Sequence, residues 1–342
     1  QKESLPFFLR QSRFFVSPHR VVHTNQAMGS PEKFSSFKQQ QLPACKPLPT
    51  APIVLPIVFC IGFACIGIGV ALVLASSSVQ ETFFLYDEQC QGLTQCMINV
   101  NIPNDYTGDV YFSYYLQNYH QNLRTYFTSR NDQQYLGDLQ KTSGCSPFDK
   151  DGDQPIVPCG AIANSMFNDT YEILFNGVPV PLTSDGLLWD AGKFKNPPDN
   201  GGVLCSRFAG TAKPPSWSKP ICEIPDGLEN VDLNNWMRIA ALPNFRKPWR
   251  KLDRSKDPAF ANGLPAGDYV VNITNQYPVK KFDGDKGFVI TTASWAGSKN
   301  NFLGIAYLSV GGVVLVIGVI LVITHAKFGH STAELGDIGE GK

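Results

Sequence analysis

Apolar residues gather in two long windows of this 342-residue chain, without the spacing of an amphipathic element. The cores of the windows are residues 51–75 and 302–326, and neither contains Asp, Glu, Lys or Arg. At about 1.5 Å per residue, a helix of this length covers roughly 37 Å, enough to cross a hydrocarbon core of about 30 Å. A buried helix of a soluble protein would show a polar face. The pattern therefore predicts two transmembrane helices.

The first window has a second interpretation, a cleaved signal peptide. Val73, Leu74 and Ala75 precede Ser76 in the manner of a small-residue cleavage site. Signal-peptide apolar regions run about 7–15 residues, however, and this window is much longer. Its length favours an uncleaved signal anchor.

Basic residues outnumber acidic residues ahead of the first window, which predicts a cytosolic N-terminal tail of residues 1–50. They are Lys2, Arg10, Arg13, Arg20, Lys33, Lys38 and Lys46, against Glu3 and Glu32. With two spans, residues 76–301 are lumenal or extracellular, and residues 327–342 form a second cytosolic tail. The first methionine is Met28, so we expect residues 1–27 to precede the native start.

The region between the windows carries two marks of an oxidising compartment. Asn168 and Asn272 each begin an Asn-X-Thr glycosylation sequon. Six of the nine cysteines also lie there, an even number that favours three disulfides. Six cysteines can pair in many ways, and pairing of neighbours closes the smallest loops. That rule predicts the bonds Cys90–Cys96, Cys145–Cys159 and Cys205–Cys222.

The same region is rich in strand-forming runs separated by Gly, Pro, Asn and Asp. The predicted strands are Val110–Leu116, Tyr171–Val180, Asp268–Val279 and Gly287–Trp295. Helical patterns are sparse: one helix is predicted over Asn118–Arg130 and a second is predicted to be capped by Asp232. The expected fold is an integral membrane protein with two transmembrane α-helices. They flank a large, mainly antiparallel β, disulfide-stapled ectodomain with few short helices.

Charge and motifs exclude several functions. The chain has 29 basic and 29 acidic residues, whereas a general nucleic-acid binder needs a basic surface. The central region has a single histidine, His120, so a His-dependent ectoenzyme would have to use it. The catalytic motifs GxSxG, HExxH and GxxxxGK[ST] are absent from the sequence, and no cofactor is expected. Residues 149–153 resemble the start of a calcium loop but lack its later ligands, which favours a solvated turn.

Two features suggest contacts with a partner. Gly67, Ala71 and Ala75 recur every fourth residue, a small-residue stripe that lets another helix approach closely. The other helix is either the second span of this chain or a different protein. Arg246 and Lys247 belong to a basic, aromatic run over residues 246–251. This run either meets anionic lipid headgroups or an acidic partner surface, or forms a charged loop that pairs with local carboxylates such as Asp253 and Asp257.

Longer strings carry a specific resemblance. They include FKQQQLPA from Phe37, PCGAIANSMFNDT from Pro158, WMRIAALPNFRK from Trp236 and NNFLGIAYLSVG from Asn300. Together they resemble the cell-division-control-protein-fifty family, also called ligand-effect modulators, over about residues 34–328. Members of that family are accessory β-subunits of type IV P-type ATPases, the phospholipid flippases. The string from Phe37 departs from the family's more usual FKQQRLPAW.

The resemblance implies a non-catalytic subunit that pairs with an ATPase and escorts it out of the endoplasmic reticulum. It remains bound while the ATPase moves aminophospholipids to the cytosolic leaflet. The implied locations are the endoplasmic reticulum, Golgi or endosome, and plasma membrane. Phe37 becomes a candidate partner contact, and Asn168 and Asn272 become expected glycosylation sites. The alternative is a subunit of a two-span ligand-gated channel, which would need polar positions along its second span, where only Ser309 and Thr324 stand.

Overall fold

A computed structural model describes residues 51–188, 194–199 and 201–329. The expectations for the two tails, including Met28 and Phe37, lie outside these residues, except for 327–329. Two 27-residue helices, α1 (Ala51–Ser77) and α6 (Phe302–Phe328), begin where the apolar windows begin and end two residues beyond them. Both are long and apolar enough to cross a membrane. The chain is a two-span membrane protein with a sheet-rich domain between the helices, as the sequence predicts.

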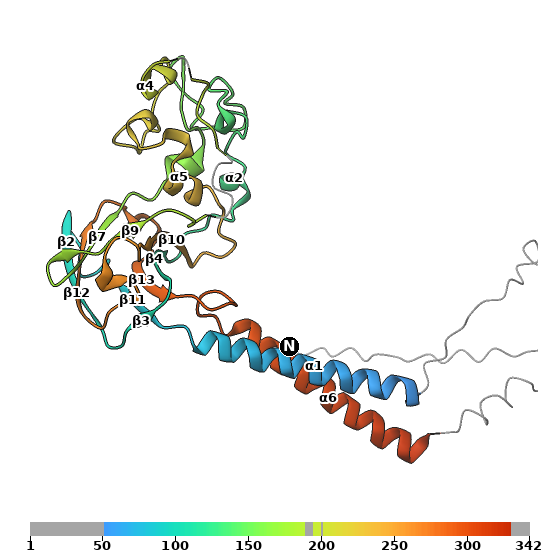
Figure 1. The fold of residues 1–342 in the computed structure, drawn as a ribbon. Coiled ribbons are helices and arrows are strands. Elements are labelled where there is room, and N and C mark those ends of the chain that lie inside the picture. The colour runs from blue at the N-terminus through green and yellow to red at the C-terminus, as the bar shows by residue number, and fades with distance from the viewer. Residues whose placement is uncertain (1–50, 189–193, 200, 330–342) are drawn as a thin grey trace, which may run out of the picture. The chain divides into compact units, whose positions relative to one another are not determined.

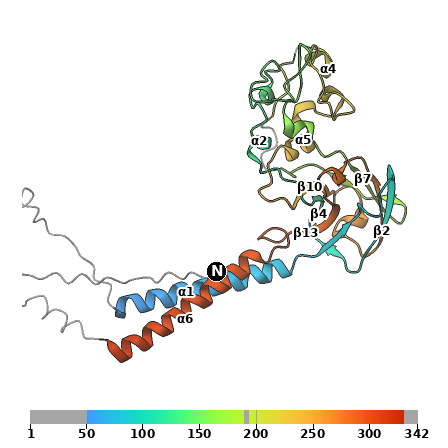
Figure 2. The ribbon, with the colours of Figure 1, turned by 180° about the vertical axis from the view of Figure 1, so that it is seen from behind.

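The helices α1 and α6 run side by side in an antiparallel pair (Figures 1 and 2). Gly62 lies against Leu315, Gly69 against Leu308, and Val73 against Gly304, so residue numbers rise along one helix as they fall along the other. Ser76 Oγ accepts a hydrogen bond of 3.0 Å from the backbone N–H of Asn300 where the pair ends. We call residues 78–301, which lie between the helices, the β domain.

Two antiparallel sheets form most of the β domain. The five-stranded sheet has the order β1-β13-β4-β10-β9, with strands β1 (Glu81–Leu85), β13 (Lys286–Thr292), β4 (Val110–Leu116), β10 (Phe245–Leu252) and β9 (Leu182–Thr183). The four-stranded sheet has the order β2-β12-β7-β8, with strands β2 (Gln95–Ile102), β12 (Gly267–Thr274), β7 (Thr170–Phe175) and β8 (Val178–Pro179). Two short pairs complete the strands: β3 (Tyr106–Thr107) with β11 (Gly263–Leu264), and β5 (Lys150–Asp151) with β6 (Gln154–Pro155).

The two sheets share one core. Along β12 the side chains of Tyr269, Val271 and Ile273 are buried, and the residues between them face outward, as a period of two requires. The ring of Tyr171 on β7 lies 4.5 Å from that of Phe288 on β13, centroid to centroid, so the sheets meet through aromatic contacts. Strand β13 is buried along its whole length.

Short helices and disulfides dominate the remaining part of the β domain. The helices are α2 (Arg124–Phe127), α3 (Ala161–Asn164), α4 (Leu204–Arg207) and α5 (Val231–Trp236). The 3₁₀ turns are η1 (Gln134–Leu136), η2 (Ile221–Glu223), η3 (Gly227–Glu229), η4 (Pro258–Phe260) and η5 (Val279–Phe282). Disulfides join Cys90 to Cys96, Cys145 to Cys159, and Cys205 to Cys222, the neighbouring pairs.

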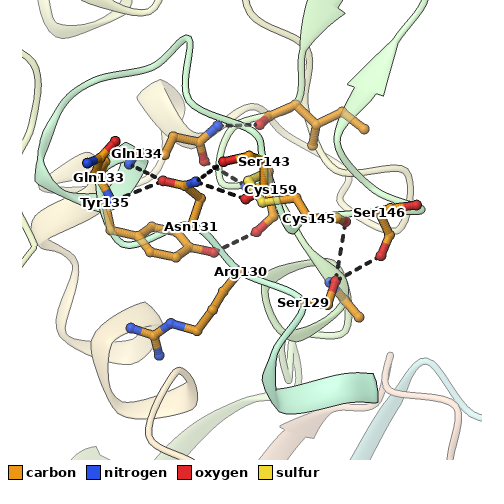
Figure 3. Close-up of a disulfide and its surroundings, with 12 residues drawn as sticks. Ser129, Arg130, Asn131, Gln133, Gln134, Tyr135, Ser143, Cys145, Ser146 and Cys159 are labelled. Carbon is orange, nitrogen blue, oxygen red and sulfur yellow. Dashed lines mark hydrogen bonds between the residues drawn. A yellow bond between two sulfur atoms is a disulfide. The ribbon is translucent and has the colours of Figure 1, made fainter. Parts of the chain in front are cut away.

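The Cys145–Cys159 disulfide lies in a dense hydrogen-bond network (Figure 3). The Gln134 side chain accepts from the N–H of Cys159 at 2.8 Å and donates to the carbonyl of Ile156 at 2.9 Å. Tyr135 donates its hydroxyl proton to the Cys159 carbonyl at 2.6 Å. These bonds satisfy buried backbone groups of a segment that has little regular structure. The hairpin β5–β6 lies inside this disulfide loop, where the sequence predicts a solvated turn.

The helix predicted over Asn118–Arg130 is mostly wrong, because only the four residues of α2 are helical. Asn118 adopts a positive φ of 58° and donates its side-chain N–H to the Phe282 carbonyl, which turns the chain. Tyr119 then packs among other aromatic rings, Trp236 included. Tertiary contacts here override a local helical pattern.

Further boundaries differ from the predictions. The run predicted as one strand over Tyr171–Val180 forms two strands, β7 and β8, because Asn176 and Gly177 both adopt a positive φ and turn the chain. The strand predicted over Gly287–Trp295 ends at Thr292. The strand predicted over Asp268–Val279 ends at Thr274, because Asn275 turns to donate its side-chain N–H to the carbonyls of Cys90 and Leu93. Helix α5 is capped by Asn230, whose side chain accepts from the N–H of Leu233 at 3.0 Å. Asp232, the predicted cap, instead pairs with Arg250 at 2.6 Å.

Candidate partner-binding site

The contact between α1 and α6 is built on glycines. Gly62 and Gly69 are buried on α1, as are Gly304, Gly311 and Gly318 on α6. A Cβ added to Gly311 would lie 2.8 Å from Ile66 and 3.0 Å from the Gly62 carbonyl oxygen. Real side chains do not tolerate such distances, so the absence of a Cβ is what lets the two backbones come together.

The predicted stripe of Gly67, Ala71 and Ala75 does not form that contact as a unit. Ala75 is buried, but Gly67 and Ala71 are exposed, and no atom lies within 4 Å of a Cβ built on Gly67. The sequence pattern did not lead us to the glycine seam between α1 and α6. Its glycines nevertheless recur every seventh residue, the period of helices that pack at a small angle. Gly67 and Ala71 therefore remain as small residues on an outward face.

The hydroxyl side chains of Ser309 and Thr324 on α6 bond to their own helix. Ser309 donates its hydroxyl proton to the Ile305 carbonyl at 2.8 Å, and Thr324 donates to Leu321 at 3.0 Å. Both hydroxyls are satisfied within their own helix. The outward faces of α1 and α6 carry large exposed apolar side chains, which suit lipid or another apolar helix.

The basic run over residues 246–251 is not a loop but strand β10, which pairs with β4 and β9. Its charges are paired within the domain: Arg246 with Glu81 at 2.6 Å, Arg250 with Asp232, and Lys251 with Asp109 at 2.9 Å. Pairing with carboxylates was one of the two interpretations, but the partners come from distant segments rather than from Asp253 and Asp257.

Lys247 is buried rather than offered to a partner, with 5% of its surface exposed. Its ammonium donates to the carbonyls of Asn235 and Trp236, both at 2.9 Å, and to that of Arg238. These carbonyls lie at the C-terminal end of α5, where a cation complements the helix dipole. Burial, aided by the nearby charge of Arg238, lowers the pKa of Lys247 to about 7. Arg246, the other basic residue predicted to contact a partner, is exposed.

The string PCGAIANSMFNDT forms a continuous structural unit. After Cys159, Gly160 has a φ of 102°, and a Cβ there would collide with the Ser129 carbonyl. The Ile162 carbonyl accepts from the indole N–H of Trp236 at 2.7 Å. Phe167 stacks on Tyr114, with ring centroids 4.2 Å apart. The disulfide at Cys159, the positive φ of Gly160 and the stacked ring of Phe167 each depend on the residue type at that position.

Asp169, in the same string, forms a buried ion pair with Lys286. The oxygen and nitrogen are 2.7 Å apart, and both side chains are nearly inaccessible, at 0% and 1% exposure. The other carboxylate oxygen accepts from the N–H groups of Gln276 and Tyr277, both at 2.6 Å. Tyr86 donates to the carboxylate at 2.8 Å, and burial raises the pKa of its hydroxyl well above 10, so it stays protonated.

The two sequons occupy different surroundings. Asn168 is exposed beside a cavity of about 500 Å³, which is also lined by Trp217, Trp249 and Arg250. Asn272 lies in the middle of β12, on the face opposite to the core.

His120 is exposed in an irregular segment rather than on a helix. Among residues 51–188, 194–199 and 201–329, no cluster of three or more His, Cys, Asp or Glu side chains is placed to hold a metal ion.

Comparisons with known proteins assign the family. Residues 72–331 match the LEM3 (ligand-effect modulator 3) family, also described as the CDC50 family. Cell cycle control protein 50A of Bos taurus is 41% identical over 327 residues, covering 87% of this chain and 90% of its own length. Cell cycle control protein 50B of Homo sapiens is 38% identical over 330 residues, covering 86% and 93%.

A plant protein is also similar. It comes from Arabidopsis thaliana, its name describes it as ALA-interacting subunit 4, and it is 36% identical over 311 residues, covering 83% of this chain and 87% of its own length. The similarity thus includes both helices and the β domain. The chain belongs to the LEM3/CDC50 family of two-span membrane proteins.

Proposed function

We propose that this chain is the non-catalytic β-subunit of a type IV P-type ATPase that moves aminophospholipids to the cytosolic leaflet. The observation that carries the proposal is the similarity to the LEM3/CDC50 family along nearly the whole chain, including a relative named as an interacting subunit. The catalytic site would be on the ATPase, and the chain would need no cofactor. The complex would be a heterodimer in contact with membrane lipids.

The subunit would place both tails in the cytosol and residues 76–301 in the lumen or outside the cell. Basic residues ahead of α1 support this orientation. In the endoplasmic reticulum the chain would help the ATPase fold and leave, and the complex would then work in Golgi, endosomes or plasma membrane. The two glycosylation sequons and three disulfides of the β domain suit that route.

The outward face of α1 is the proposed contact within the membrane. Gly67 and Ala71 are exposed there, and they would let a transmembrane helix of the ATPase approach closely. Phe37, in the cytosolic tail, and Arg246, which is exposed on strand β10, are further candidate contacts. Because the seam with α6 uses other residues, changes at Gly67 and Ala71 should weaken the complex without separating the two helices.

Uptake of a fluorescent phosphatidylserine by cells that lack this chain tests the proposal. We expect slow uptake and an ATPase retained in the endoplasmic reticulum, with both defects reversed by the wild-type chain. The variant Gly67→Leu/Ala71→Leu should reach normal levels but restore little uptake. The control Ile61→Leu, which conserves volume at another exposed position of α1, should restore it fully. Normal uptake and normal ATPase exit without the chain would refute the proposal.

A further inference from the structure

The cavity beside Asn168 is lined by both aromatic and charged side chains. Its lining combines the aromatic rings of Trp217, Trp249 and Tyr114 with the charged pair Arg250 and Asp232. Arg250 forms two hydrogen bonds with that carboxylate, at 2.6 and 3.0 Å, and its guanidinium lies 4.9 Å from the centre of the Trp249 ring. The volume of about 500 Å³ falls within the rough range of 300–1,000 Å³ for small-ligand sites.

This combination suits a sugar. Pyranose rings have an apolar face of C–H groups that packs on aromatic rings, and an edge of hydroxyls that needs hydrogen-bond partners. Aromatic side chains provide the first contact, and the fixed Arg250–Asp232 pair provides donors and acceptors for the second. Ser216 and Ser218 add hydroxyls at the wall of the cavity.

The acceptor asparagine is held in place at the edge of this cavity. Its neighbour Asp169 is anchored in the core by Lys286 and Tyr86, so the backbone of Asn168 is fixed. Thr170, the third residue of the sequon, begins strand β7 and is exposed. The Asn168 side chain is exposed as well. The sequon therefore combines a rigid backbone with an accessible amide.

We propose that Asn168 carries an N-linked glycan whose first N-acetylglucosamine residues lie in this cavity, packed on Trp249 and hydrogen-bonded to Arg250 and Asp232. The glycan is then part of the folded domain and covers apolar surface that would otherwise face water. The inference rests on the proposed lumenal position of the β domain but not on the ATPase.

Asn272 offers an internal comparison. Its side chain lies on the outward face of β12, 3.4 Å from a carboxylate oxygen of Glu172 across the strand pair. It is not part of the lining of the Asn168 cavity. A glycan at Asn272 would extend into solvent, whereas one at Asn168 would be held against the protein.

Digestion with peptide N-glycosidase under native conditions separates the two sites. The full chain, purified in mild detergent from cells that glycosylate it, is compared in the variants Asn272→Gln and Asn168→Gln, which each keep one sequon. We expect release from Asn168 to be about tenfold slower than from Asn272, equivalent to about 1.4 kcal/mol of protection. After denaturation, both glycans should be released at the same rate.

A second variant shows whether the cavity gives the protection. In the Asn272→Gln background, Trp249→Ala should restore rapid release from Asn168. The control Trp295→Ala removes a tryptophan that is 78% exposed and not in the cavity lining, and it should change nothing. An unmodified Asn168 by mass spectrometry, equal native release from both sites, or protection that survives Trp249→Ala would each overturn the proposal. A chain that is glycosylated but binds no ATPase would refute the proposed function alone.

Discussion

Different contacts stabilise the α1–α6 pair and the β domain. The helices meet through glycines that bring the backbones together, and the residues at the centre of the seam are apolar. The β domain has an aromatic core, three disulfides and the buried pair Asp169–Lys286. Within the described residues, most of the apolar helix surface remains exposed, whereas the β domain buries its own apolar surface.

This difference indicates which region needs lipid or a partner protein to cover its apolar surface. Helices with exposed large apolar residues require lipid or a partner along their length, and close packing leaves little room for a side chain at the glycines of the seam. The β domain instead depends on internal polar contacts. Removing one partner of a buried ion pair is strongly destabilising, because the other partner is left buried and unpaired. Substitutions in the two regions should therefore differ in the contacts they break and in the stability they cost.

The largest expected effect comes from the buried ion pair of the β domain. Asp169→Asn removes the charge that faces Lys286, and leaving one buried charge unpaired costs about 3–5 kcal/mol. The variant keeps an Asn-Asn-Thr sequon at Asn168, so loss of glycosylation cannot explain its behaviour. Thermal unfolding of the purified chain should show the loss, and a midpoint equal to that of the wild type would contradict it.

Loss of the Cys145–Cys159 disulfide should be somewhat milder. The bond spans 14 positions of the sequence, and a loop of that size is stabilised by about 3 kcal/mol. We expect Cys145→Ser/Cys159→Ser to lower the unfolding midpoint. Cys60→Ser, which changes a free cysteine of α1, should not. Equal midpoints for the two variants would show that the surrounding hydrogen bonds are sufficient.

Neighbouring glycines of α6 provide a matched pair for the helix seam. Gly311→Leu places a side chain against Ile66 and the Gly62 carbonyl, and overpacking of this kind costs about 1–3 kcal/mol. A Cβ built on Gly312 has no described atom within 4 Å, so Gly312→Leu begins in open space. Size-exclusion profiles after a heating series should show a lower midpoint for the first variant only. The same loss in both would mean that the seam is elsewhere.

The smallest expected effect, taken over a single pH unit, is a dependence of stability on pH. The pKa of Lys247 is about 7 in the folded chain, against 10.5 for an ordinary lysine. Between these values the unfolded chain binds more protons, so the free energy of unfolding should rise with pH, by up to about 1.4 kcal/mol per pH unit. Lys247→Met should remove this slope, whereas Lys251→Met, on the same strand, should retain it. An unchanged slope in Lys247→Met would contradict the assignment.

The features predictable from sequence were those with a strong local pattern. The two apolar windows became α1 and α6, strand β4 has its predicted bounds, and neighbouring cysteines are bonded. Strand β10 was missed because its charged residues mimic a surface loop, and their partners, such as Glu81, are far away in sequence. The helix over residues 118–130 failed for a related reason, since Tyr119 packs against rings from distant segments.

The candidate site was predicted only in part. Gly67 and Ala71 lie on an open face, but the glycine seam with period seven was overlooked in favour of spacing by four. Lys247 was grouped with exposed basic residues because sequence gives no sign that three carbonyls surround it. The cavity beside Asn168 joins segments separated by many residues, so no local pattern marks it.

Co-purification tests the central claim, that this chain is a subunit of a P-type ATPase, most directly. The tagged full chain is isolated from its own cells in mild detergent, and its partners are identified and quantified by mass spectrometry. We predict one equivalent of a P-type ATPase, reduced in the Gly67→Leu/Ala71→Leu variant and retained with Ile61→Leu. A chain recovered alone, or as a homotrimer without an ATPase, would contradict the claim and favour the channel alternative.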